Sequence, residues 1–240
     1  MKTAKIFLAL GLGLVVSACA SVDVPTRNTP YEPMPNTAVA MPAGYQSSRV
    51  ETNTDTIAAP DALFTLVPGQ SLVSVNSIVI RVPRTLKVSE ANRFLPRGDI
   101  VWRGDPMGDR YAQVQAIFQT AMAKGAATLD GPVKVDIDIQ VQRFHALTEK
   151  ARYTTGGVHA ITFDLAIKDP KTGELLMPIR TIKADLDGFG GNMALQAEAL
   201  GQTQKVRITD HLANVIRQEL SNPQGYENAS LGFYQMLNSL

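Results

Sequence analysis

The sequence lacks several features that would point to a particular chemistry. It contains a single cysteine, Cys19, so no intramolecular disulfide can form, and the rest of the chain has no thiolate for a zinc site or a nucleophile. An excess of one charge is also missing, because 23 Lys and Arg residues balance 22 Asp and Glu residues and leave a formal net charge of +1. Nucleic-acid binding draws most of its affinity from basic residues that neutralise phosphates, so we expect no nucleic-acid partner.

The first residues carry a clear pattern. Lys2 and Lys5 precede an apolar run of about eleven residues, which is too short to span a bilayer but typical of a secretory signal. Small residues then precede the cysteine, as a peptidase that cuts an extended chain requires. We therefore predict a signal peptide over residues 1–18, which ends in Val16-Ser17-Ala18 before Cys19.

This ending resembles the lipobox of bacterial lipoproteins, in which a branched apolar residue and two small residues precede an obligatory cysteine. The resemblance implies that the thiol of Cys19 takes a diacylglyceryl group, that the chain is cut before this residue, and that acyl chains such as palmitate anchor it in the bilayer. It implies a place in the cell envelope facing the periplasm, and Ala20 after the cysteine favours the outer membrane over the inner one. The alternative is an ordinary secretory signal followed by a chance cysteine.

The chain then divides into a linker, one domain and a tail. Residues 19–70 are predicted to form a flexible linker, because prolines lie among Thr, Ser, Asn and Ala without a sustained period of 2 or 3.6. The linker is either a spacer that separates the domain from the membrane or a segment without a function of its own. Residues 71–222 are predicted to form a single domain. The tail, residues 223–240, either packs on this domain or binds a partner, and we favour packing.

Hydrophobic periodicity predicts six elements in the domain. The clearest period of 2 runs from Val133 to Val141. Asp105 before Pro106 is expected to cap the first helix, and the Asp-Pro-Lys-Thr-Gly stretch at 169–173 is expected to form a turn. In chain order we predict a strand over 72–82, a helix over 106–127, strands over 133–142, 161–168 and 175–186, and a helix over 203–220.

These elements predict an α+β fold of order β-α-β-β-β-α. Each predicted strand has one polar face, which is typical of an antiparallel sheet with one side open or lightly covered. We expect about four strands with two amphipathic helices packed on one face of the sheet. The predicted architecture is a two-layer sandwich.

The segment between the second and third predicted strands carries the residue types of a binding surface. Donors and an aromatic ring lie near Gly156 and Gly157, which permit close backbone approach. His145 and His159 continue the apolar alternation of two neighbouring predicted strands, so a hairpin could bring their rings together. A metal site needs more ligands than these two rings supply. We therefore favour a structural role, in which the partly buried rings cap the inner face of the sheet. The alternative for the hairpin tip is a solvated turn. The candidates for partner binding are Arg143, His145, Arg152, Tyr153 and His159.

The other motifs do not build a catalytic site. Two Arg-Gly-Asp tripeptides, at 97–99 and 103–105, fit turn and capping roles better than adhesion. The glycine cluster at 188–191 lacks the Lys and Ser or Thr of a phosphate loop. Asp185 and Asp187 have no partner acid that would make a glycosidase pair. We therefore predict no enzyme, no metal site and no cofactor.

The block from Leu95 to Asp99, through Arg143-Phe144-His145, to the segment 156–159 resembles an uncharacterised family of small bacterial envelope lipoproteins. The element order is more loosely similar to auxiliary lipoproteins of lipid-transport systems and of curli-type secretion, a likeness of topology only. Our leading hypothesis is a non-catalytic envelope lipoprotein that binds a protein partner or assembles in an envelope complex. The alternative is a periplasmic carrier or sensor that binds a lipid or small ligand between sheet and helices, and a hydrolase ranks third.

Overall fold

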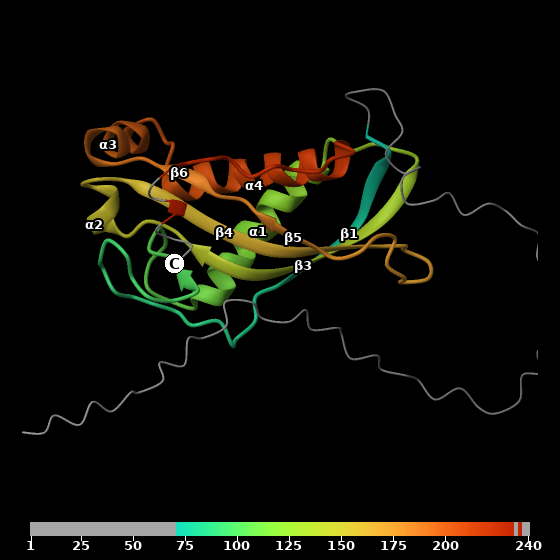
Figure 1. Cartoon of the computed structure of the whole chain (residues 1–240), viewed down its shortest axis with the longest axis horizontal. Helices are drawn as coiled ribbons and strands as arrows, with labels where there is room; N and C mark the ends of the chain where they lie inside the picture. Colours follow the sequence, from blue (N-terminus) through green and yellow to red (C-terminus); the bar gives the residue numbers. More distant parts are fainter. Residues whose placement is uncertain (1–70, 233–234, 237–240) are drawn as a thin grey trace, which may run out of the picture.

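The structure, a computed structural model, describes residues 71–232 and 235–236 (Figure 1). The predicted signal peptide, Cys19 and the linker lie outside the described residues. The elements in chain order are β1 (Val73–Arg81), β2 (Ile100–Val101), α1 (Arg110–Ala126), β3 (Val133–His145), α2 (Glu149–Arg152), β4 (Gly157–Lys168), β5 (Arg180–Lys183), β6 (Leu186–Gly188), α3 (Gly191–Ala199) and α4 (Gln204–Ser221).

The six strands form one open, mixed sheet. Its main order is β1-β3-β4-β5, with β2 beside β3 and β6 beside β4. The central strands β3, β4 and β5 are antiparallel, as predicted, but β1 and β2 run parallel to β3. The expectation of an antiparallel sheet is wrong for these two pairs, because α1 carries the chain back to the starting end of β1 before β3 begins, and such a crossover joins parallel strands. The α+β class and the two-layer arrangement are confirmed.

The core lies between the sheet and the two long helices, α1 and α4. Alternating residues of β3 and β4 point to this side and join the apolar stripes of both helices in one buried cluster. Phe118 of α1 contacts the rings of Phe144 and Phe163, with ring centroids 6.2 and 5.5 Å apart. At Gly125 the helices approach so closely that a Cβ atom would lie 2.4 Å from the carbonyl oxygen of Ala213. The two predicted helices therefore occupy one face of the sheet, as expected.

The first long helix begins later than predicted. The N-cap is Asp109, whose side chain accepts hydrogen bonds from the backbone N–H groups of Tyr111 and Ala112. The carboxylate of Asp105, the predicted cap, instead accepts from the indole of Trp102 at 2.8 Å and from Lys205 at 2.9 Å. Because these partners hold the Asp105 side chain, it cannot cap a helix, and the chain turns once more before α1.

The predicted strand over 175–186 is interrupted. Asp169 forms the expected turn by accepting from the backbone N–H groups of Lys171 and Thr172. Beyond this turn, regular pairing covers only β5 and β6, apart from an isolated bridge at Leu175. Pro178 has no N–H to donate to a ladder, which disfavours a continuous strand through this segment. The short helices α2 and α3 were also not predicted.

The outer face of the sheet is polar, and several side chains at its centre pair with each other. Asp138 accepts from Arg81 and Lys168, with distances of 2.9 and 2.8 Å. Asp164 accepts from Gln142 and Thr181 on the two neighbouring strands. Asp138, Gln142 and Asp164 are accordingly buried. Within the described residues, the structure contains no helix that is long and apolar enough to cross a bilayer.

Candidate functional site

The two histidines of the predicted site lie on opposite faces of the sheet. A register shift between Val141 and Arg143 inserts one extra residue into β3, so that His145 pairs with Ala160 of β4. His159, one residue away on β4, must point to the other side because successive side chains of a strand alternate. The expectation that both histidines continue the inner apolar face is therefore wrong for His145, and the two rings do not converge. Within the described residues there is no group of three metal-ligating side chains.

His145 connects the end of β3 to the loop before β2. Its Nδ1 lies 3.2 Å from the guanidinium Nη2 of Arg143, and its Nε2 lies 3.1 Å from the carbonyl oxygen of Pro96. A guanidinium only donates, so Nδ1 is the acceptor, and Nε2–H donates to the carbonyl. A neutral His145 in this tautomer satisfies both contacts, which fixes its ring against the loop.

Beside this ring the surface opens into a cavity of about 210 Å³, which we call the apolar cavity. One wall is the loop with Phe94 and Leu95, which are 46% and 52% exposed, and the other is the chain between β3 and β4. Lys150 stands at the rim with its Nζ 4.8 Å from the centroid of the Phe94 ring. The lining residues are Phe94, Leu95, Pro96, His145, Ala146, Leu147, Thr155, Gly156, Gly157 and Val158.

Hydrogen bonds hold the two walls of the apolar cavity in place. The hydroxyl of Thr148 donates to the carbonyl oxygen of Arg93 at 2.7 Å, and the backbone N–H of Lys150 donates to the side chain of Asn92 at 2.9 Å. At Gly156, φ is +72°, and an added Cβ would lie 2.6 Å from the carbonyl oxygen of Gly188. Only glycine fits this position, so the cavity wall packs directly against the end of β6.

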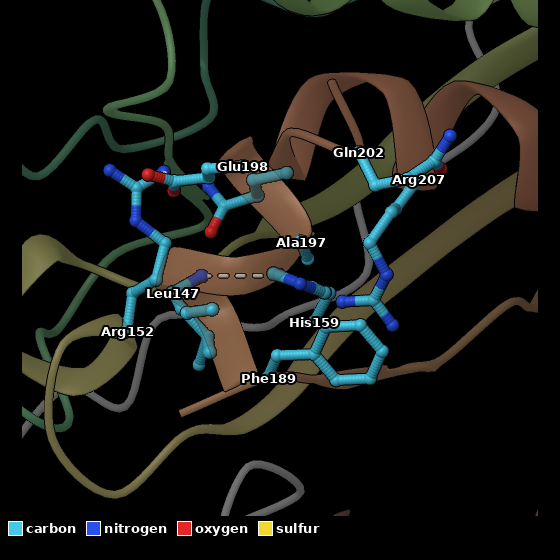
Figure 2. A pocket seen from close by; sticks show the side chains of 10 residues that line it. Leu147, Arg152, His159, Phe189, Ala197, Glu198, Gln202 and Arg207 are labelled. Atoms are coloured by element: carbon cyan, nitrogen blue, oxygen red, sulfur yellow. Dashed lines mark hydrogen bonds and ion pairs between the residues drawn. The ribbon is translucent and has the colours of Figure 1, made fainter. Parts of the chain in front are cut away.

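Arg152 and His159 lie on the inner side near α3, in what we call the polar cluster (Figure 2). The third candidate, Tyr153, joins this cluster through the contact of its hydroxyl group with Glu198. Arg152 lies 3.2 Å from a carboxylate oxygen of Glu198, whose other oxygen accepts from the Tyr153 hydroxyl at 3.3 Å. Arg207 stacks over the Phe189 ring, 3.4 Å from its centroid, and donates to the carbonyl oxygen of Asp187 at 2.8 Å. The space left in this cluster measures about 10 Å³, which is the room for one water molecule.

His159 is the buried centre of the polar cluster. Its Nδ1 accepts the backbone N–H of Leu147 at 3.2 Å, as the dashed line in Figure 2 shows. Burial lowers the pKa of His159 to about 3, and the nearby positive charge of Arg207 acts in the same direction. The imidazole is therefore neutral at physiological pH and acts as a hydrogen-bond acceptor for the backbone.

The remaining sequence motifs have structural roles. Arg103 pairs with Glu149, and Asp99 accepts from the backbone N–H of Lys87, so both Arg-Gly-Asp tripeptides contribute to loop structure. Asp185 accepts from the side chains of Asn228 and Gln235 at 2.9 and 2.7 Å. The described part of the tail therefore packs on its own domain, as favoured from the sequence.

The structure thus separates the five predicted residues into two groups. His145 lines the apolar cavity and Arg143 contacts its ring, whereas Arg152, Tyr153 and His159 belong to the polar cluster. Sequence reasoning missed the role of Phe94 and Leu95 as a cavity wall. A signal was present, because two large apolar residues follow each other in a loop that is otherwise polar, where no strand or helix would bury them.

Residues 73–236 match a family of unknown function, DUF6778. No curated protein sequence is significantly similar to the chain. Among solved structures, a candidate lipoprotein from Caulobacter crescentus CB15 is 14% identical with a TM-score of 0.29, and the match covers 45% of this chain and 80% of that one. A DUF330 protein from Xanthomonas campestris is 11% identical with a TM-score of 0.34, covering 60% and 83%. At such TM-scores neither likeness carries an argument about function.

Proposed function

We propose that this chain, which belongs to the family of unknown function DUF6778, is a lipid-anchored envelope protein whose non-catalytic domain binds a protein partner. The apolar cavity beside His145 is the observation that carries the proposal. It is open at the surface, and two large apolar side chains at its wall remain about half exposed in the isolated chain. Exposed apolar surface around a concave site is typical of an interaction surface.

The size of the apolar cavity favours a protein partner over a free ligand. Sites for small molecules usually enclose about 300–1,000 Å³. The cavity measures about 210 Å³ and so suits one large apolar side chain of a partner, the kind of anchor that dominates binding energy at protein interfaces. The alternative of a carrier with a ligand between sheet and helices is not favoured, because side chains such as Phe118 and Phe163 fill that layer.

The membrane anchor in this proposal rests on the lipobox resemblance at Cys19. We expect the protein to incorporate labelled palmitate and to sediment with outer membranes, because two or three acyl chains hold a protein on a bilayer. Replacement Cys19→Ser should abolish the label and release the protein into the soluble fraction. Unchanged sedimentation of this variant would exclude the lipid anchor and leave the domain's binding role to be judged separately.

Site-specific crosslinking in intact cells tests the partner-binding role. A photoreactive amino acid at Leu95, 52% exposed at the cavity wall, should give one discrete adduct larger than the protein. The matched control is Leu175, which is 49% exposed near the turn between β4 and β5. An adduct from position 95 that is absent from position 175 supports the proposal. The same adducts from both positions, or none from either, would refute it.

A further inference from the structure

We infer that the apolar cavity binds an acidic segment of the partner, with one large apolar side chain in the cavity and carboxylates on its rim. This inference rests on the proposed function and names the chemistry of the partner. Three exposed cations are adjacent to residues that line the cavity. Arg93 and Arg97 flank the lining residues 94–96 in sequence, and the ammonium group of Lys150 contacts the Phe94 ring.

These cations are available for a partner, because nothing nearby in the described chain neutralises them. No ion pair between described residues involves Arg93, Arg97 or Lys150. The ammonium group of Lys150 contacts an aromatic ring instead, and a cation–π contact leaves most of its charge free to attract an anion.

Several acidic residues at this end of the domain are already paired. Glu90 accepts from Arg110 at 2.7 Å, which holds the pKa of its carboxyl group below the usual range. Glu149 pairs with Arg103, and Glu198 pairs with Arg152. Asp99 and Asp187, the latter opposite Val158 in the pairing of β4 with β6, form none of the ion pairs between described residues. The three cations outnumber these two carboxylates, so the charge offered to a partner is positive, although the whole chain has a formal net charge of only +1. Complementary charge at a rim accelerates association and selects the partner.

The shape of the site favours a protein segment over an anionic membrane surface. A bilayer presents a broad face, which suits protruding side chains, whereas this surface is hollowed between the loop at 94–96 and the chain at 155–158. A peptide can fill the hollow with a single side chain while its backbone crosses the rim. Acidic residues on either side of that anchor then lie near the cations.

Short synthetic peptides test this inference on the full-length protein. The probes are a labelled peptide with Phe between acidic residues, the same peptide with Ala in place of Phe, and one with Lys in place of the acids. Fluorescence anisotropy should show binding of the acidic Phe peptide at least about 10-fold tighter than that of either other peptide, and the difference should shrink at high salt. Equal affinity for the acidic and basic Phe peptides would overturn the inference.

Charge-reversal variants of the protein provide a second test of the inference. The triple variant R93E/R97E/K150E should lose about 10-fold in affinity for the acidic Phe peptide, whereas the control K171E, at the turn between β4 and β5, should keep it. If L95D abolishes binding but the triple variant does not, the cavity binds a partner without charge selection, and only this inference fails. If neither change affects binding, both proposals fail. Preferential binding of the protein to phosphatidylglycerol vesicles, lost in the triple variant, would assign the surface to a membrane and overturn the inference.

Discussion

The two sides of the sheet where β3 and β4 meet differ although each contains one buried histidine. On the inner side, His159 lies among charged and aromatic groups that leave about 10 Å³ of free space. Several of these groups pair with one another, although buried polar atoms of Arg152, Glu198 and Gln204 have no hydrogen-bond partner within the described residues. On the outer side, His145 borders an open cavity of about 210 Å³ with apolar walls. The comparison shows that Arg, His and Tyr residues near a hairpin do not by themselves mark a binding surface. Where such side chains fill the space between elements, little room remains for a partner, and the larger surface available to a partner lies where apolar groups remain exposed.

Leu147 separates these two sites. Its side chain lines both, and its backbone N–H donates to His159. A single residue therefore closes the polar cluster and forms part of the apolar cavity. The different properties of the two sites follow from what covers them: helices α3 and α4 cover the polar cluster, whereas the apolar cavity is bordered by the loop at 94–96 and the chain between β3 and β4. We expect mutations on the inner side to change stability and mutations on the outer side to change binding.

The largest expected effect is that of Gly156→Ala, at the place where the two sites meet. The new Cβ would lie 2.6 Å from the carbonyl oxygen of Gly188 and 2.8 Å from the backbone nitrogen of Gly190, at φ +72°. Strain and overpacking together should lower the free energy of unfolding by about 3 kcal/mol in urea denaturation. Gly173→Ala is the matched control, because φ there is +73° and no atom lies within 4 Å of the new Cβ. It should cost only about 1 kcal/mol. If both variants lowered the free energy of unfolding by the same amount, the contact between Gly156 and β6 would not be tight.

The next effect is a loss of stability in mild acid caused by His159. Its folded pKa, about 3, lies below the ordinary value of 6.5, so the stability it contributes is present above pH 6.5 and is lost as the pH falls toward 3. Between pH 7 and pH 5 the free energy of unfolding should fall by about 2 kcal/mol from this residue. Burial also lowers the pKa of His211, which adds a loss in the same direction.

His159→Asn separates the two histidine contributions. The Asn side-chain oxygen can replace Nδ1 as the acceptor for Leu147 but does not titrate. The variant should therefore unfold with a shallower dependence on pH between 7 and 5 than the natural protein, measured by urea denaturation at each pH. An unchanged dependence would mean that His159 is protonated without unfolding, and the description of the polar cluster as closed would be wrong.

The fold was predictable from sequence where periodicity is strong. The alternation from Val133 to Val141 and the stripe of the last helix gave the correct elements on the correct layer. The prediction failed where local chemistry allowed two answers. Both Asp105 and Asp109 suit a helix cap, and only the position of Trp102 and Lys205 in three dimensions decides that Asp105 bonds elsewhere. Likewise, β1 runs parallel to β3 because of the path of α1 between them. The alternation of apolar residues in a strand does not indicate the direction of its neighbour.

The site was predictable only in part, because its geometry depends on one inserted residue. The register shift after Val141 moves His145 to the outer face, and a period of 2 read along the sequence does not reveal it. Arg143 and His145 lie at the end of β3, beside the hairpin, but the loop with Phe94 and Leu95 is about 50 positions away in sequence. It meets them through the pairing of β2 with β3 and through the hydrogen bonds between its backbone and the chain after β3, which the sequence pattern does not reveal.

The smallest expected effect on stability, and the sharpest test of the comparison, is Leu95→Ser. Leu95 is already 52% exposed, so its removal forfeits little burial and should change the free energy of unfolding by no more than about 0.5 kcal/mol. Leu175→Ser, at 49% exposure, should behave in the same way in denaturation. The two variants should differ only in binding, because Leu95 alone of the two lines the apolar cavity. A loss above about 2 kcal/mol for Leu95→Ser would show that this side chain holds the loop in place, since that is the range of a buried core residue. The apolar cavity would then resemble the polar cluster, as a site whose contacts serve the fold.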